Sequence, residues 1–341
     1  MVAGYRVAVV GATGVVGQEI LLILKERGFP IAELTVLADE SWDGKRISFG
    51  DEQLTVHTAV PESFQGIEIA FFATNGPVSE ALVPEAVKRG AVAIDNSSAF
   101  RLDPETPLVV PEVNPQDVGW HKGIIANPNC STILFVVPIK PLHDAAHIKR
   151  AVVSTYQAVS GSGKAGIDEL LEETRQVLAG EPIQPGVFPY QIAFNLIPHI
   201  DVFGDNGYSR EEMKMLLETR KILHDPDMKI SATTVRVPVF RSHSESVNIE
   251  TERKLTPGAA RAILAGASGV VVEDDPAGLK YPMPLFASDH DEVFVGRIRE
   301  DLSCDQGLNF WLCGDQLRKG AATNAVQIAE LLVNGRLTHG V

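Results

Sequence analysis

The first third of the chain alternates short apolar runs with segments whose apolar residues recur every three or four positions. The short runs are rich in branched aliphatic residues and are typical of buried strands, whereas the recurring pattern, for instance at Ile20, Ile23 and Leu24, is typical of helices. Predicted strands are 6–10, 33–37, 68–73 and 91–95, and predicted helices include 18–27 and 78–89. Strands that alternate with helices in this way predict a doubly wound parallel sheet.

From about residue 150 the alternation changes, because longer strands and polar loops replace the regular repeat. This pattern predicts an α+β domain with a mixed sheet and helices on one side. Predicted strands are 152–159, 233–239, 246–250, a run near Val270 and 293–299, and predicted helices are 167–179, 211–223 and 257–266. We interpret 160–166 and 182–198 as loops.

The length of 341 residues is enough for two domains. We expect a Rossmann-type domain over 1–129, completed by a returning C-terminal helix within 316–341. Residues 130–315 would form the α+β domain.

Composition, charge and cysteine spacing argue against several kinds of partner and site. Apolar residues make up 45% and charged residues 22%, as in ordinary globular proteins. The net charge of −14 disfavours nucleic acid and anionic lipid as partners, and an anionic substrate would need a local cationic pocket. There is no stretch of eighteen apolar residues and no signal-peptide pattern, so we expect no membrane span and a cytoplasmic location. The three cysteines show no zinc-type spacing, so we expect neither a metal nor a disulfide framework.

Three glycines, Gly11, Gly14 and Gly17, follow the first predicted strand and open the first predicted helix. Glycine at these positions permits a tight turn and a close approach of the backbone to a pyrophosphate at the helix N-terminus. The order of strand, glycine loop and helix therefore predicts a dinucleotide site, with a turn that binds no ligand as the alternative.

Cys130 lies where an extended segment, 127–129, leads into an apolar helix. The N-terminus of a helix is the positive end of its dipole, which favours the thiolate, the nucleophilic form of cysteine. A cysteine nucleophile in a dinucleotide-binding chain suggests aldehyde oxidation through a thioester. The alternative is a buried cysteine that only packs.

Eight motifs, in their order and spacing, resemble aspartate-semialdehyde dehydrogenase over nearly the whole chain. They are the segments 11–17, 96–101, 127–132, 157–161, 211–214 and 236–239, His243, and 319–322. The resemblance implies reductive dephosphorylation of 4-phospho-L-aspartate to L-aspartate 4-semialdehyde with NADPH. That step feeds lysine, methionine, threonine and diaminopimelate synthesis. It also implies a Rossmann domain, a dimerisation domain, and a homodimer or homotetramer that takes a small-molecule substrate and phosphate.

The same resemblance assigns roles to individual residues. Cys130 would form the thioester, His243 would be the acid/base, Gln157 would orient the substrate, Arg236 would bind its carboxylate and Glu211 its amino group. Phosphate would be bound by Arg101, Lys214 and Asn129. The cofactor-binding residues would be Gly11, Thr13, Gly14, Val15, Val16, Ser41, Trp42, Ser160, Gly161 and Gln316. Without the other motifs, His243 would be interpreted as a structural histidine, and Glu211 with Lys214 as a solvated pair on a helix surface.

The sequence departs from the family pattern in one segment that concerns the cofactor. Members of this family commonly carry a Ser-Arg segment that binds the 2′-phosphate of NADP, but residues 37–44 contain no arginine. Asp39 stands where an acidic residue would accept a hydrogen bond from a ribose 2′-hydroxyl. We therefore expect NADP as the first cofactor and expect NAD to be used as well.

Two other functions agree with part of this sequence pattern. N-acetyl-glutamyl-phosphate reductase shares the glycine loop and the cysteine, but it usually has glycine before the cysteine, where this chain has Asn129. An inactive paralogue that acts as a binding protein would tend to lose the reactive residues, whereas Cys130, Gln157, Arg236 and His243 are all present.

Overall fold

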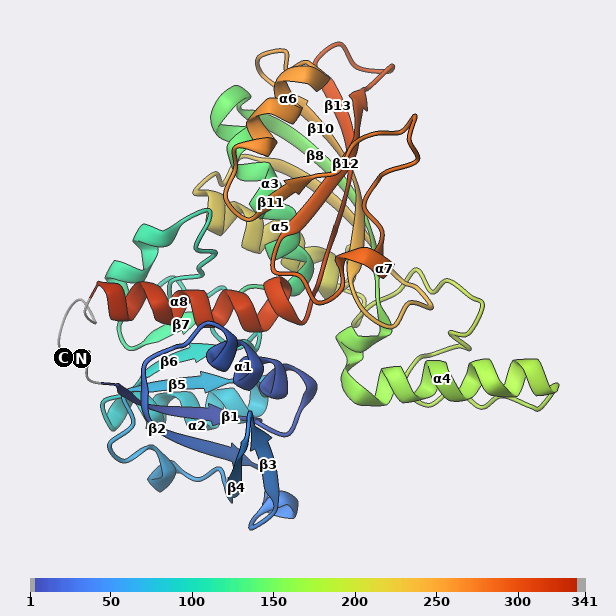
Figure 1. Cartoon of the computed structure of the whole chain (residues 1–341). Helices are drawn as coiled ribbons and strands as arrows, with labels where there is room; N and C mark the ends of the chain where they lie inside the picture. The colour runs from blue at the N-terminus through green and yellow to red at the C-terminus, as the bar shows by residue number, and fades with distance from the viewer. Residues whose placement is uncertain (1–3, 336–341) are drawn as a thin grey trace. The chain divides into compact units, whose positions relative to one another are not determined.

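The computed structural model describes residues 4–335. These residues divide into two compact units (Figure 1). The first unit contains the chain up to Asn129 and resumes at Ala321, and the second is Cys130–Gly320. Residues 316–320, which we predicted to join the first domain, belong to the second unit. The last part of the predicted returning segment, 336–341, lies outside the described residues.

A seven-stranded sheet forms the centre of the first unit, in the order β3-β4-β2-β1-β5-β6-β7. Its strands pair in parallel except β3, which is antiparallel to β4. The strands are β1 (Tyr5–Val10), β2 (Ile31–Ala38), β3 (Arg46–Phe49), β4 (Glu52–Thr58), β5 (Ile69–Phe72), β6 (Val92–Asp95) and β7 (Ile124–Ala126). The Rossmann-type prediction is confirmed. The pattern missed β3 and β4, whose residues are largely polar at the sheet edge, and β7, which is only three residues long.

Helices cover both faces of this sheet because the strand residues alternate between two cores. Val7, Val9 and Phe71 pack with α1 (Val15–Glu26) and α8 (Thr323–Asn334). Ala8 and Phe72 pack with the helix on the other face, α2 (Gly76–Lys88). Helix α8 thus returns the end of the chain to the first unit, as predicted, although it begins at Thr323.

The second unit is built on a six-stranded mixed sheet in the order β11-β12-β13-β10-β8-β9. Its strands are β8 (Ile148–Gln157), β9 (Lys229–Arg236), β10 (His243–Thr251), β11 (Val270–Val272), β12 (Val293–Glu300) and β13 (Gly307–Gly314). The prediction of a mixed sheet is confirmed. Strand β13 was not predicted, and β10 begins at His243, three residues before the predicted start at 246.

Helices α3 (Cys130–Ala146), α5 (Arg210–Leu223) and α6 (Pro257–Ala265) pack on this sheet. Helix α4 (Gly163–Ala179) extends away from the sheet in Figure 1. It includes most of the segment that we predicted as a flexible loop, 160–166. A small apolar cluster that includes Leu170, Phe188 and Ile192 anchors this helix to the long loop that follows. Among the described residues, the remaining α-helix, α7, is the single turn Pro284–Ala287.

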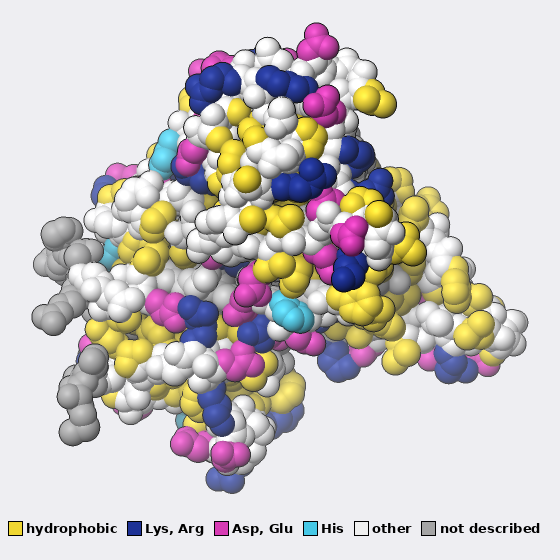
Figure 2. All heavy atoms as spheres, turned by 45° about the horizontal axis from the view of Figure 1, so that its top comes forward, with side chains coloured by type: hydrophobic (Ala, Val, Ile, Leu, Met, Phe, Trp, Pro, Cys, Tyr) yellow, Lys and Arg dark blue, Asp and Glu magenta, His cyan; other side chains and the backbone are white. Residues whose placement is uncertain are grey.

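The surface carries both signs of charge despite the net charge of −14. On the face drawn in Figure 2, acidic and basic side chains are interspersed with apolar ones. A site for an anion must therefore be built from particular neighbouring cations, since the net charge of the chain repels it. Among residues 4–335, no helix combines the length and the apolar character that crossing a membrane requires.

Candidate active site

Cys130 is the first residue of helix α3 and is partly exposed. Its Sγ lies 3.4 Å from Nε2 of His243, the first residue of β10. The sequence placed the cysteine at a helix start, and the fold brings to it an imidazole from 113 residues further along the chain. A sulfur at the positive end of a helix dipole, in contact with an imidazole, is an arrangement suited to nucleophilic catalysis.

A hydrogen bond at Nδ1 determines which ring nitrogen of His243 carries the proton. The backbone N–H of Ala158 donates a hydrogen bond of 3.0 Å to Nδ1. Because a backbone N–H can only donate, Nδ1 must carry its lone pair, and the single proton of the neutral ring lies on Nε2. Complete burial, with the nearby charge of Arg236 as a second cause, lowers the pKa of His243 well below its ordinary value. The ring is therefore a neutral donor whose Nε2–H points at the sulfur.

Two further predicted residues lie in the same row of the sheet as His243. Gln157 of β8 pairs in register with Arg236 of β9, and His243 of β10 lies at the same level on the other side. Gln157 donates from Nε2 to Glu211 over 3.1 Å, and Arg236 donates from Nη1 to the carbonyl of Ala158 over 2.6 Å. All three side chains of this row are buried. We call Arg236, Gln157 and His243 the catalytic row.

Glu211 and Lys214 form a partly buried ion pair and not the fully solvated surface pair of the alternative interpretation. The Glu211 side chain is only 7% exposed, and Lys214 Nζ lies 3.0 Å from it and 2.9 Å from Asp201. Burial would lower the pKa of Lys214, but the two carboxylates outweigh burial and raise it. Asp201, which lies in a loop, was not predicted because no local pattern marks it as a partner of Lys214.

Ser160, Gly161 and Gln316 surround the start of β10. Gln316 accepts a 2.7 Å hydrogen bond from the backbone N–H of Ser242 and donates to the Ser160 hydroxyl. A Cβ at Gly161 would lie 2.8 Å from Nη1 of Arg236, so a larger residue would displace that guanidinium. Their predicted role in cofactor binding stays a prediction.

In the first unit the glycine loop has the geometry that a dinucleotide requires. Gly11 has a φ of +78°, and a Cβ there would lie 2.3 Å from the carbonyl oxygen of Ala73. A Cβ at Gly17 would lie 2.1 Å from the Gly11 carbonyl oxygen. Gly14 is the N-cap of α1 and provides no side-chain cap, which leaves the first N–H groups of the helix for a ligand. The residues present therefore fit a pyrophosphate at this helix.

A cavity of about 640 Å³ adjoins this loop, and its lining includes Gly11, Thr13, Asp39 and Glu40. Asp39 accepts hydrogen bonds from the backbone N–H and the hydroxyl of Ser41, which lower the pKa of its carboxyl group. Lys45 lies 4.7 Å from the centre of the Trp42 ring. These hydrogen bonds favour the charged form of Asp39 beside the cavity. The Ser41 hydroxyl already donates its proton to this carboxylate.

Arg101 and Asn129 belong to the first unit, and both are buried. Arg101 donates to the backbone carbonyls of Asn127 and Asn96 over 2.9 and 2.7 Å. Arg101 thus connects the two asparagine-containing motifs that follow β6 and β7. Lys214 belongs to the second unit, so the predicted phosphate site of these three residues stays a prediction.

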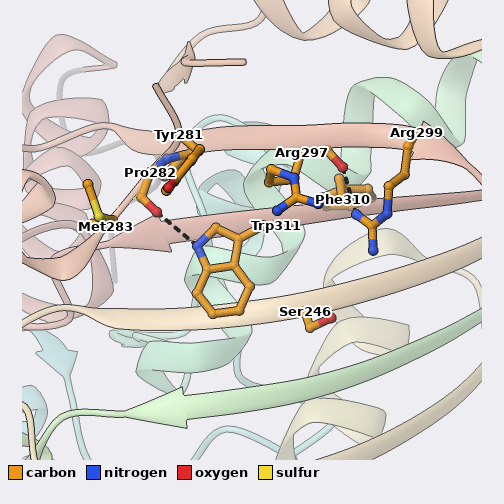
Figure 3. Close-up of a pocket in the computed structure, with 8 residues that line it drawn as sticks. All are labelled: Ser246, Tyr281, Pro282, Met283, Arg297, Arg299, Phe310 and Trp311. Atoms are coloured by element: carbon orange, nitrogen blue, oxygen red, sulfur yellow. Dashed lines mark hydrogen bonds between the residues drawn. The ribbon is translucent and has the colours of Figure 1, made fainter. Parts of the chain in front are cut away.

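A second cavity, of about 280 Å³, lies on the second sheet (Figure 3). Ser246 and Trp311, which pair across β10 and β13, line it, and the Trp311 indole donates to the carbonyl of Pro282 over 3.0 Å. Because side chains alternate along β10, Ser246 faces away from the side that carries His243. This cavity therefore does not contain the catalytic row.

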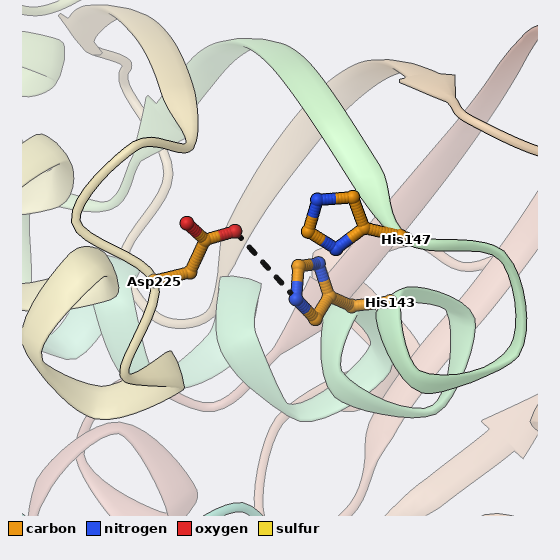
Figure 4. A group of neighbouring side chains, drawn as sticks. All are labelled: His143, His147 and Asp225. Carbon is orange, nitrogen blue, oxygen red and sulfur yellow. Dashed lines mark ion pairs between the residues drawn. The ribbon is translucent and has the colours of Figure 1, made fainter.

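Among the described residues, one cluster offers metal-ligand atoms within 4.8 Å of one another: His143, His147 and Asp225 (Figure 4). His143 accepts a 3.2 Å hydrogen bond at Nδ1 from the N–H of Ile148, so its neutral ring carries the proton on Nε2. That nitrogen faces Asp225 at 3.7 Å. A metal-binding histidine normally presents a lone pair at one nitrogen and donates from the other. This hydrogen bonding instead directs an N–H at the carboxylate.

Comparison with known proteins identifies both units. The pattern of the semialdehyde dehydrogenase NAD-binding domain matches residues 6–121, and that of the semialdehyde dehydrogenase dimerisation domain matches residues 139–319. The aspartate-semialdehyde dehydrogenase of Aquifex aeolicus is 55% identical over 334 residues, covering 97% of this chain and 98% of its own. That of Bacillus subtilis is 52% identical and covers 96% and 97%.

The solved structures that resemble this chain belong to enzymes of the same name as these relatives. Aspartate-semialdehyde dehydrogenase II of Vibrio cholerae, complexed with ASA, superposes with a TM-score of 0.95 at 46% identity, covering 97% of this chain and 98% of its own. The Candida albicans enzyme with NADP gives a TM-score of 0.76 at 25% identity, with 98% and 99% covered. The predicted oxidoreductase class and nicotinamide cofactor are confirmed, and the chain belongs to the aspartate-semialdehyde dehydrogenase family.

Proposed function

We propose that this chain catalyses the NADPH-dependent reductive dephosphorylation of 4-phospho-L-aspartate to L-aspartate 4-semialdehyde through a thioester at Cys130. The contact of 3.4 Å between Cys130 Sγ and His243 Nε2, at the N-terminus of α3, is the observation that carries this proposal. The reaction serves amino-acid biosynthesis, in agreement with the family of the chain.

In the first step the Cys130 thiolate attacks the acyl carbon of the substrate. A carbon–sulfur bond forms, the bond to the phosphate oxygen breaks, and phosphate leaves with the bonding electrons. Two groups favour the thiolate in the resting enzyme: the N-terminus of α3 and the Nε2–H of His243. No base has to remove the thiol proton during the attack.

Bound NADPH supplies the hydride that reduces the thioester. The thioester oxygen becomes an oxyanion, and His243 Nε2–H would donate a hydrogen bond to it. The carbon–sulfur bond then breaks, which gives the aldehyde and restores the thiolate. His243 therefore acts as a neutral donor, since the acid/base role implied by the resemblance would require a second proton on Nδ1, where Ala158 already donates.

Substrate recognition would follow from the buried charges of the second unit. Arg236 would pair with the substrate carboxylate, Glu211 with its amino group, and Gln157 would orient it between them. Arg101, Lys214 and Asn129 would bind the phosphate, which needs neighbouring cations in a chain of net charge −14.

The first unit would bind the cofactor, and the second would provide catalysis and the contact between subunits. The loop of α1 fits a pyrophosphate, and the match of residues 139–319 to a dimerisation domain supports a homodimer or homotetramer. Ser160, Gly161 and Gln316 would contact the nicotinamide end, and Val15, Val16, Ser41 and Trp42 the rest of NADP. The free cysteines suit a reducing cytoplasm.

Replacement of Cys130 by serine tests the covalent step. Cys130→Ser should lower turnover by more than about a thousandfold, because a serine hydroxyl is far less ionised than a thiol at neutral pH. The assay is reduction of NADP with aspartate semialdehyde and phosphate, and the N-acetyl-glutamate analogue serves as the contrasting substrate. The melting temperature should match that of the wild type. Substantial turnover in the folded variant would contradict a thioester at this position.

The lowered pKa of His243 predicts a pH dependence of stability. Below pH of about 6.5 an unfolded histidine takes up a proton that folded His243 does not bind, so the free energy of unfolding falls as the pH falls. Urea unfolding of His243→Asn between pH of about 5 and 8 should show a shallower slope than the wild type. Nitrogen NMR of the wild type should show a neutral ring protonated on Nε2, and an imidazolium at neutral pH would refute the donor role.

Replacement of Arg236 and of Arg101 should change the Michaelis constants of different substrates. Arg236→Leu should raise the Michaelis constant for the semialdehyde by about tenfold to a hundredfold, as expected for loss of a charged hydrogen bond, with a smaller effect on that for phosphate. Arg101→Leu should instead raise the Michaelis constant for phosphate, with a smaller effect on that for the semialdehyde. Arg236→Lys is the matched control, because it retains the charge but not the planar fork. Equal effects of both leucine variants on both constants would show that the pocket is misassigned.

Poor discrimination between NADP and NAD should follow from Asp39, whose carboxylate lines the cavity. We expect a preference for NADP in kcat/KM of less than about a hundredfold, roughly 2.7 kcal/mol. Asp39→Ser combined with Ser41→Arg should shift the preference towards NADP, because it replaces a carboxylate by a cation near the 2′-phosphate. Steady-state rates with both cofactors measure this. A wild-type preference above that limit would show that another cation binds the 2′-phosphate.

A further inference from the structure

Asp315 is a buried acidic residue directly after β13, and no step of the reaction assigns a role to it. Its side chain is 0% exposed. Oδ2 accepts hydrogen bonds from Nε of Arg241 over 2.6 Å and from the backbone N–H of Asp289 over 2.8 Å. Oδ1 accepts from the backbone N–H groups of Leu317 and Arg318 over 2.9 and 3.1 Å. A carboxylate offers about four lone-pair positions, so these bonds occupy the whole group.

The arginine that Asp315 binds belongs to the segment that leads into His243. Arg241 lies two residues before His243, and Ser242 lies between them with a φ of +71°. A residue other than glycine costs free energy in this left-handed conformation and persists there only where its surroundings hold it. Gln316, the neighbour of Asp315, accepts a 2.7 Å hydrogen bond from the N–H of Ser242. Two consecutive side chains therefore hold the two residues that precede the catalytic histidine.

The stretch of chain that contains Asp315 also borders α3, the helix that begins at Cys130. Gly314, the last residue of β13, pairs in register with His243. A Cβ at Gly314 would lie 2.6 Å from Cδ2 of Leu134 in α3. A Cβ at Gly320 would lie 3.2 Å from the Cβ of Cys130. This stretch is therefore packed closely against the N-terminal turns of α3 at both of its ends.

We infer that Asp315 is a positioning residue of this enzyme, which holds His243 Nε2 at its distance from Cys130 Sγ by joining the segment before β10 to the segment after β13. It acts on the first segment through the side chain of Arg241 and on the second through two backbone N–H groups. The hydrogen bond from Ala158 orients the imidazole ring, whereas Asp315 fixes the place of the backbone that carries the ring. The inference rests on the proposed function, in which His243 acts at the sulfur.

Asp289 provides the matched control, because its side chain pairs with the same guanidinium. Its carboxylate lies 3.1 Å from Nη1 of Arg241, but the side chain is 74% exposed, and an exposed ion pair contributes little. Asp289→Asn retains the backbone N–H that Asp315 accepts, and asparagine tolerates the φ of +67° at this position. Asp315→Asn makes the same chemical change at the buried partner. Whichever way that amide is turned, its NH2 group faces two N–H donors.

Steady-state kinetics of the full-length enzyme test the contact between Asp315 and Arg241 from both sides. Asp315→Asn and Arg241→Gln should each lower kcat with aspartate semialdehyde by about tenfold to a hundredfold, because the imidazole and the sulfur are displaced from each other. The Michaelis constant for the semialdehyde should change by less than about threefold, since the carboxylate-binding side chain is not altered. The double variant should lose no more than the larger single loss, because both changes remove one contact. Asp289→Asn should stay within about twofold of the wild type.

Alkylation of Cys130 by iodoacetamide tests the inference without a substrate. At pH of about 7 the rate, measured by peptide mass spectrometry, should be about threefold to tenfold lower in Asp315→Asn and Arg241→Gln, since His243 no longer supports the thiolate. A role in stability alone would leave this rate unchanged or raise it through exposure of the thiol. Asp289→Asn should react at the rate of the wild type.

The alkylation rates decide the inference even if the wild type does not use aspartate semialdehyde, an outcome that would refute the proposed function alone. The variants are compared at a temperature where their circular dichroism matches that of the wild type. If Asp315→Asn does not fold, Arg241→Gln decides, because the Arg241 side chain is 26% exposed and its replacement leaves Asp315 three backbone donors. Alkylation as fast as in the wild type, or an equal loss in Asp289→Asn, would overturn the inference.

Discussion

The hydrogen bond from the backbone of Ala158 to His243 Nδ1 determines how the catalytic groups of this enzyme face one another. It leaves Nε2 as the protonated nitrogen and directs it at Cys130, 3.4 Å away. Ala158 follows directly after Gln157, at the end of β8, and its carbonyl accepts from Arg236. One peptide segment therefore orients both the histidine and the guanidinium, which makes the end of β8 the fixed point of the site.

Several buried polar groups of the second unit share the face of its sheet that carries His243, where their burial would be costly without partners. Most are paired: Gln157 with Glu211 and Thr155, Lys214 with Glu211 and Asp201. Such a network fixes amide and imidazole orientations that single contacts would leave free. Glu245 and Thr234 lie on this face and have no side-chain hydrogen-bond partner among the described residues.

Cofactor recognition in the first unit depends on two kinds of constraint. The glycine loop is constrained by space, because a Cβ at Gly11 or Gly17 would overlap a backbone carbonyl. Selectivity at the 2′-position instead depends on charge, since Asp39 keeps its carboxylate beside the cavity through two hydrogen bonds from Ser41. Binding of a dinucleotide and discrimination between NADP and NAD are therefore separable properties of this unit.

The sequence by itself determined the features that depend on local order along the chain. The glycines between β1 and α1, Cys130 at the start of α3 and the period of the central strands all follow from neighbouring residues.

Only the tertiary structure decided which distant groups meet. The register of β10 against β8 places Glu245 opposite Thr155, the Ala158 N–H selects the proton position on His243, and a loop residue, Asp201, reaches Lys214. No local pattern encodes these contacts, because strand pairing joins segments that are far apart in the chain. Hydrogen-bond direction and burial, which determine the charge and tautomer of each group, depend on those contacts.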